Sequence, residues 1–87
     1  MHSVRLTRRA EKELEDVHRA DRRLYERFLA AFETISRDPE AEGKPLQGEL
    51  KGLRSHRFGS YRVLYELRKR ELVVVVVDLG HRREIYR

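Results

Sequence analysis

The chain has 87 residues and a formal net charge of +5, and 40% of its residues are charged. This length suits a single domain, residues 1–87, built around one modest core. Cysteine is absent, which excludes a disulfide framework, a thiolate nucleophile and cysteine-ligated zinc or iron–sulfur sites.

The sequence contains neither a membrane helix nor a signal peptide. The longest apolar run, residues 72–77, is far shorter than the roughly 20 residues that span a bilayer. The N-terminal stretch MHSVRLTRR lacks the apolar segment of a secretory signal. We therefore expect a soluble, cytoplasmic protein that does not bind membranes.

The N-terminal half predicts a short strand and two helices. Residues 3–7 alternate with a period of two, which is typical of a strand. Thr7 can cap a first helix over 8–19, and Asp21 can cap a second one that Pro39 ends. Apolar stripes at helical spacing predict that both helices pack on a sheet. The stripes consist of Ala10, Leu14 and Val17 in the first helix and of Leu24, Phe28, Ala31, Phe32 and Ile35 in the second.

The C-terminal half predicts a loop and three strands. Residues 39–52 contain both prolines and three of the five glycines, which is typical of a loop, with a short turn at 46–50. Strands are expected at 53–58, 61–68 and 71–79. The order β-α-α-β-β-β predicts an α+β fold, in which a two-helix hairpin packs on one face of a mostly antiparallel four-stranded sheet.

Five consecutive valines, residues 73–77, lie in the last predicted strand. A strand with one exposed face should alternate, so this run predicts a central strand with both faces buried. The helices can cover only one face. The other face must be covered by the chain's own C-terminal residues or by a partner.

The excess positive charge is confined to the predicted strands and the C-terminus. Residues 1–53 contain 11 Lys or Arg and 11 Asp or Glu, whereas residues 54–87 contain 9 and 4. Balanced charge is typical of a solvated helical surface, and an arginine-rich excess on strands favours binding to a polyanion. Solubility alone is the alternative explanation.

A tight turn places two arginines opposite each other. Gly59 suits the first central position of a type II′ turn, which would pair Arg57 with Arg62 across the hairpin. Like charges in this arrangement are destabilising, but two guanidiniums side by side can bind one phosphate through charge-assisted hydrogen bonds. The alternative is that each arginine pairs with a carboxylate, Glu66 or Glu84.

The C-terminal segment GHRREIYR follows the valine strand directly and is rich in functional groups. A buried strand is a rigid support for the residues that leave it. This segment and residues 43–67, GKPLQGELKGLRSHRFGSYRVLYEL, together resemble the RelE/ParE superfamily of toxins from bacterial and archaeal toxin–antitoxin pairs. The resemblance extends over nearly the whole chain, and the family fold has the same order of elements.

The resemblance implies a choice between two activities. RelE-like members cleave messenger RNA in the ribosomal A site, whereas ParE-like members poison DNA gyrase and generally lack the arginine and tyrosine set. Here Arg62 matches the RelE-like sheet arginine, and Arg82 and Tyr86 match the C-terminal arginine and tyrosine. Two alternating lysines of the family pattern are replaced in LRSHRF, which leaves the general base open between Tyr86, His81 and His56. Tyr86 could alternatively only cap the valine strand.

The expected activity is a metal-free endoribonuclease without a cofactor. The carboxylates of the C-terminal half are single and scattered, which argues against a two-metal site. The expected catalytic residues are Arg62, Arg82, Tyr86 and His81, and the expected RNA- or phosphate-binding residues are Lys51, Arg54, His56, Arg57 and Arg83. Expected partners are a cognate antitoxin, messenger RNA on the ribosome and, only through the antitoxin, operator DNA. The alternatives are a ParE-like gyrase inhibitor and a non-catalytic module that binds nucleic acid.

Overall fold

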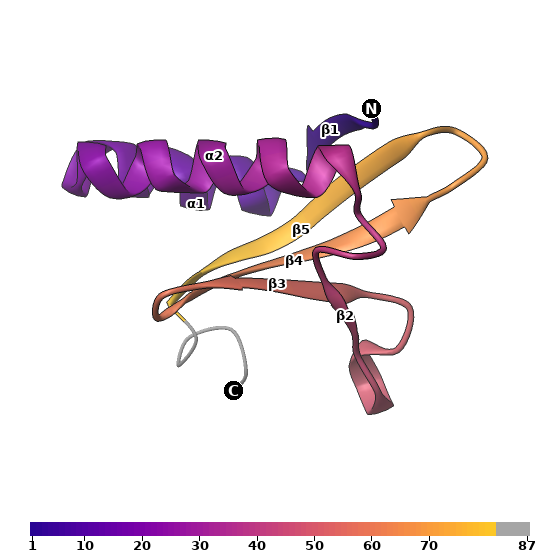
Figure 1. Ribbon diagram of the computed structural model, residues 1–87. Helices are drawn as coiled ribbons and strands as arrows, with labels where there is room; N and C mark the ends of the chain where they lie inside the picture. Colours follow the sequence, from indigo (N-terminus) through magenta and orange to yellow (C-terminus); the bar gives the residue numbers. More distant parts are fainter. Residues whose placement is uncertain (82–87) are drawn as a thin grey trace.

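The computed structural model describes residues 1–81, which form two helices on one sheet (Figure 1). The sheet order is β1-β5-β4-β3-β2, with β1 parallel to β5 and the other pairs antiparallel. The predicted α+β class and the element order are confirmed. The elements are β1 (Ser3–Leu6), α1 (Arg8–Ala20), α2 (Arg22–Arg37), β2 (Lys44–Pro45), the 3₁₀ turn η1 (Gly48–Leu50), β3 (Arg54–Phe58), β4 (Tyr61–Arg68) and β5 (Val73–His81).

The sheet has five strands, so the prediction of four was wrong. The additional strand, β2, lies inside the predicted loop and pairs Lys44 with Ser55 and Pro45 with Arg54. A two-residue strand that ends in proline carries no periodic signal, and proline is tolerated there because β2 is an edge strand.

Side-chain caps define the starts of both helices, as predicted. Thr7 Oγ1 accepts a hydrogen bond from the Ala10 N–H at 3.2 Å, and Asp21 Oδ1 accepts one from the Leu24 N–H at 3.0 Å. None of the helices in the described residues is both long and apolar enough to cross a bilayer.

One face of the sheet and the two helices enclose the core. Its largest fully buried side chains come from α2, β4 and β5, and an aromatic cluster lies beneath the β3–β4 turn, where Phe28 contacts Phe58 at 4.9 Å between ring centroids. Removing these apolar side chains from water is the main stabilising contribution. The largest fully buried side chains are Phe28, Ile35, Val63, Tyr65, Val74 and Val76.

The valine strand, β5, is an interior strand with an irregular register. Leu64 pairs with Asp78 and the next residue, Tyr65, pairs with Val76, so Val77 is an extra residue in a β-bulge. The bulge shifts the alternation, and Leu79 therefore joins the core after Val76. Val75 and Val77 are only half-buried. The prediction that both faces are buried therefore holds fully only for the face under the helices.

Candidate phosphate-binding site

Arg57 and Arg62 are direct cross-strand partners on β3 and β4. Gly59 has a φ of 56°, as a type II′ turn requires, and Phe58 pairs with Tyr61 on the two sides of the turn. Strand alternation places both arginines on the sheet face opposite the helices, because the next residue, Val63, is buried in the core. The arginine pair predicted from the turn is therefore present.

The two arginines line a pocket of about 450 Å³, which we call the arginine pocket. Arg62 Nη1 donates to the Oγ of the buried Ser55 at 3.5 Å, while Arg57 is exposed. Lys44 adds a third cation, and Glu42 is the one acidic residue among the described lining residues. This excess of positive charge suits a phosphate group. The lining residues are Ala41, Glu42, Gly43, Lys44, Pro45, Leu46, Ser55, His56, Arg57 and Arg62.

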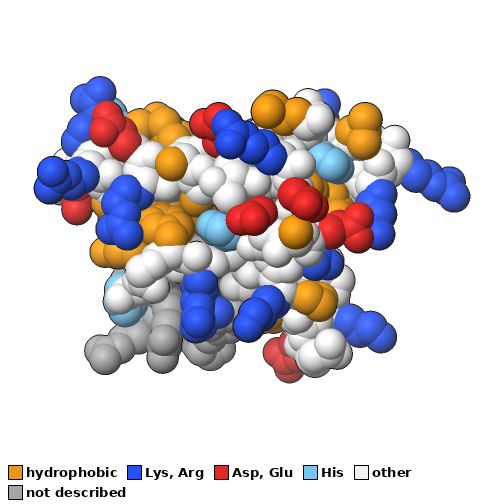
Figure 2. Space-filling view, in the orientation of Figure 1, with side chains coloured by type: hydrophobic (Ala, Val, Ile, Leu, Met, Phe, Trp, Pro, Cys, Tyr) orange, Lys and Arg blue, Asp and Glu red, His pale blue; other side chains and the backbone are white. Residues whose placement is uncertain are grey.

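Charge is distributed unevenly on the face drawn in Figure 2. Basic side chains are spread over both the helices and the sheet, and acidic side chains lie over the helices, in the middle of the view and at its lower edge. In the sequence, the described residues after position 53, 54–81, include six Lys or Arg and three Asp or Glu, whereas residues 1–53 are balanced. The sheet side of the molecule is therefore the more attractive one for a polyanion.

The alternative in which Glu66 neutralises the arginine pair is not supported. Glu66 Oε1 accepts a hydrogen bond from Arg68 Nε at 2.6 Å instead. Glu84, the other alternative partner, lies outside the described residues.

Gly80 is the cross-strand partner of Arg62 on β5. It has a φ of 147°, a backbone conformation that favours glycine. Because glycine has no side chain, nothing projects over Arg62 from this position. Glycine at this position therefore suits the backbone path of β5.

Arg54 and His56 lie on β3 but alternate to the face opposite Arg57. The Arg54 guanidinium donates to Glu40 O at 2.7 Å and to Gly43 O at 2.9 Å. His56 Nδ1 lies 2.7 Å from Glu42 O, and since a carbonyl only accepts, Nδ1 carries the proton and Nε2 is left as the acceptor. Both side chains thus hold the loop that lines the arginine pocket.

Tyr65 also anchors the loop that lines the arginine pocket. Its hydroxyl donates to Pro39 O at 2.5 Å, and the side chain is fully buried. Burial raises the pKa of Tyr65, although the hydrogen bond from Arg54 and its charge act in the opposite direction. Tyr65 is therefore a core residue, and its phenol stays protonated at neutral pH.

Lys51 and His81, the other predicted site residues that the structure describes, do not line the arginine pocket. Lys51 lies in the exposed turn after η1, and it does not line the pocket. His81 ends β5 opposite Tyr61, with 5.6 Å between the ring centroids, and so faces away from Arg62. Arg82, Arg83 and Tyr86 lie outside the described residues.

Two residues of the arginine pocket were missed by sequence reasoning. Lys44 lay within the quoted family-like segment, but nothing in the sequence indicated that it pairs with β3 as part of a strand. Ser55 could have been found by strand alternation, since it is two residues from Arg57 and therefore shares its face.

Comparison with known proteins agrees with the resemblance of the sequence to the RelE/ParE superfamily of toxins. The family model described as "ParE toxin of type II toxin-antitoxin system, parDE" matches residues 4–86. The chain therefore belongs to this family of toxins, within the RelE/ParE superfamily.

Curated relatives and solved structures extend this assignment. Toxin RelG of Mycobacterium tuberculosis is 38% identical over 87 residues, which cover 99% of this chain and 97% of the relative. Toxin RelE of the same organism is 36% identical over 70 residues, covering 75% and 72%. A chain in the toxin–antitoxin complex RelBE2 from M. tuberculosis matches with a TM-score of 0.83 at 36% identity, covering 93% of this chain and 91% of that one. The YoeB/ParE toxin from Agrobacterium tumefaciens, at 22% identity and a TM-score of 0.81, covers 91% and 96% and shares the fold.

Proposed function

We propose that this toxin cleaves messenger RNA in the ribosomal A site without a metal ion. The observation that carries the proposal is the cross-strand pair of Arg57 and Arg62 at a pocket with a third cation, Lys44. Two facing guanidiniums can bind one phosphate together through charge-assisted hydrogen bonds, which supports an anionic ligand at this position.

In the proposed reaction, the 2′-hydroxyl of the substrate attacks the adjoining phosphorus. A bond forms between the 2′-oxygen and phosphorus, the bond from phosphorus to the 5′-oxygen breaks, and the products are a 2′,3′-cyclic phosphate and a 5′-hydroxyl. Arg57 and Arg62 stabilise the charge that develops on the non-bridging oxygens, together with Arg82. Each such donor is typically worth roughly 2.7–4 kcal/mol of transition-state stabilisation.

Two proton transfers complete the reaction. One group removes the proton of the 2′-hydroxyl and another delivers a proton to the leaving 5′-oxygen. Tyr86 is our first candidate because it matches the family tyrosine, and neighbouring guanidiniums would favour its phenolate. His56 is the alternative among residues 1–81, because its Nε2 can accept a proton, but its side chain alternates to the face opposite Arg57. We assign Arg54 a supporting role in the loop.

A cognate antitoxin is the second part of the proposal. The M. tuberculosis relative with 36% identity was solved as a toxin–antitoxin complex. We propose that the partner of this chain is a segment that folds upon binding and carries acidic residues complementary to the basic sheet face. Contacts with operator DNA would come through the antitoxin.

The test is controlled expression followed by mapping of messenger 5′ ends. The wild-type chain should stop growth and produce cleavage at codon boundaries within translated regions, and Arg62→Ala should abolish both effects. Arg68→Ala is the matched control, because Arg68 lies on the same strand but pairs with Glu66 outside the arginine pocket. Intact messenger during toxicity would reject the proposal.

Gyrase inhibition is the second candidate, favoured by the ParE description of the matching family model. Double-strand DNA breaks and an SOS response, together with intact messenger RNA, would select it over RNA cleavage.

A further inference from the structure

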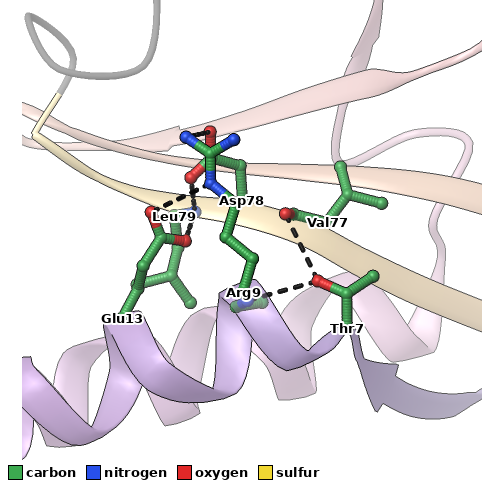
Figure 3. Close-up of polar contacts among 7 residues, drawn as sticks. Thr7, Arg9, Glu13, Val77, Asp78 and Leu79 are labelled. Atoms are coloured by element: carbon green, nitrogen blue, oxygen red, sulfur yellow. Dashed lines mark hydrogen bonds and ion pairs between the residues drawn. The ribbon is translucent and has the colours of Figure 1, made fainter.

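One edge of β5 pairs with β1, but β1 ends before β5 does. β1 pairs through Leu6 with Val76, whereas β5 continues to His81. The start of α1 takes the place of β1 along this edge, as Figure 3 shows in part. The Thr7 N–H donates to Val76 O at 3.0 Å, and Thr7 Oγ1 donates to Val77 O at 3.4 Å.

Glu13 makes the next contact along this edge. Its Oε1 accepts a hydrogen bond from the Leu79 N–H at 3.2 Å, and Asp78 Oδ1 accepts from the same N–H at 2.9 Å. In Figure 3 the Glu13 side chain reaches from α1 to β5. The backbone of β5 is thereby fixed by a helix side chain just before the strand ends at His81.

The carboxyl groups of Glu13 and Asp78 share one guanidinium. Arg9 Nη2 lies 3.4 Å from Asp78 Oδ2, and Arg9 Nε lies 3.7 Å from Glu13 Oε2. Burial raises the pKa of Glu13 to about 7, with further contributions from the hydrogen bond to Asp78 and from its negative charge, while the Leu79 N–H and Arg9 act in the opposite direction. Near neutral pH, the Glu13 carboxyl is therefore protonated for part of the time.

We propose that Glu13 is a positioning residue that fixes the last residues of β5, Leu79–His81, against α1. It does so by holding the Leu79 amide against α1. Ionisation of Glu13 leaves two carboxylates beside one guanidinium, which weakens the contact between α1 and β5. The effect on RNA cleavage rests on the proposed function, whereas the effect on Leu79 does not.

The first test follows the Leu79 amide resonance of the full chain by NMR as the pH is varied. In the wild type this resonance should titrate with a midpoint of about 7. In Glu13→Gln it should stay constant, because glutamine keeps a carbonyl oxygen for the Leu79 N–H but cannot ionise. In Asp78→Asn the midpoint should move to lower pH, because the neighbouring negative charge is gone. A pH-independent Leu79 resonance in the wild type would overturn the proposal.

The second test measures cleavage of a reporter messenger on programmed ribosomes. Glu13→Leu should lower kcat by roughly 10- to 100-fold, since a misplacement of about 1 Å can cost that much, with KM within about twofold of the wild type. Glu13→Gln should restore kcat at pH 6. Glu15→Leu is the matched control, because Glu15 is an exposed carboxylate on the same helix. An unchanged kcat in Glu13→Leu would overturn the positioning role.

The two proposals can fail separately. If the wild type cleaves no RNA under any condition, the proposed function is rejected, and the Leu79 titration still decides whether Glu13 holds the strand. If the wild type cleaves RNA but Leu79 does not titrate, the positioning role is rejected alone. If Glu13→Leu does not fold, the Leu79 titration in the wild type, compared with that in Glu13→Gln, still tests the positioning role.

Discussion

Replacing Gly43 by alanine tests how tightly the loop before β2 is packed against the sheet. A Cβ at this position would lie 2.1 Å from Tyr65 Oη, 2.8 Å from Cζ and 3.0 Å from Cε1. The ring has no room to withdraw, because Tyr65 is fully buried and its hydroxyl is hydrogen-bonded to Pro39 O. Gly43 has no positive φ, so the cost of the substitution is steric.

The expected loss of stability follows from two contributions. Overpacking a close-packed site typically costs about 1–3 kcal/mol. Displacement of the Tyr65 hydroxyl from Pro39 O removes a buried hydrogen bond, which is worth about 0.5–1.5 kcal/mol. We therefore expect Gly43→Ala to lower the free energy of unfolding by about 2–4 kcal/mol. Urea denaturation measures this loss as a lower midpoint at an unchanged m value.

Two control variants separate the clash from other effects. Gly48→Ala should cost only about 1 kcal/mol, because its φ of 68° is strained but no atom lies within 4 Å of its Cβ. Tyr65→Phe removes the atom that lies closest to the new methyl group. The loss of stability in the double variant with Gly43→Ala should therefore be smaller than the sum of the two single losses by about 1 kcal/mol. A wild-type midpoint for Gly43→Ala, or strict additivity in the double variant, would refute the reasoning.

The remaining predictions concern charge. Arg57→Glu should raise the free energy of unfolding by roughly 0.5–1 kcal/mol, because it replaces a repulsive cross-strand pair, and it should weaken RNA binding at low salt; a loss of stability would contradict this. Burial raises the pKa of Glu13 from its ordinary value of 4.5 to about 7, so the folded state binds more protons, and stability should fall as the pH rises from 4.5 to 7. After allowance for partial exposure we expect a loss of about 1–2 kcal/mol in urea denaturation, absent in Glu13→Gln. Because burial raises the pKa of Tyr65, Tyr65→Phe should remove less than one quarter of the tyrosinate absorbance that the four tyrosines give at pH 10.

Local signals were sufficient to predict most of the fold. Thr7 and Asp21 mark the helix starts by their own side chains, and Gly59 marks the turn that pairs Arg57 with Arg62. The bulge at Val77 could not be predicted, because identical residues give no alternation from which a register can be read. The strand β2 was missed for a related reason, since its pairing depends on a loop conformation and not on a pattern.

The site was predictable where it depends on neighbouring strands and unpredictable where it depends on distant elements. The opposite orientation of Arg54 and Arg57 follows from alternation, but the loop carbonyls that bind Arg54 do not. Glu13 and Leu79 are 66 residues apart, and nothing in the sequence relates them. Their contact arises because β1 ends before β5, which leaves a strand edge that α1 covers.

The central claim is that the two guanidiniums of the arginine pocket act together on one phosphate. The most direct test is a double-variant cycle of single-turnover cleavage of messenger RNA on programmed ribosomes. Arg57→Ala and Arg62→Ala should each lower the rate by about 10²- to 10³-fold, and the double variant should lose little more than the worse single variant. Multiplication of the two single losses in the double variant, or wild-type rates in either single variant, would contradict the account.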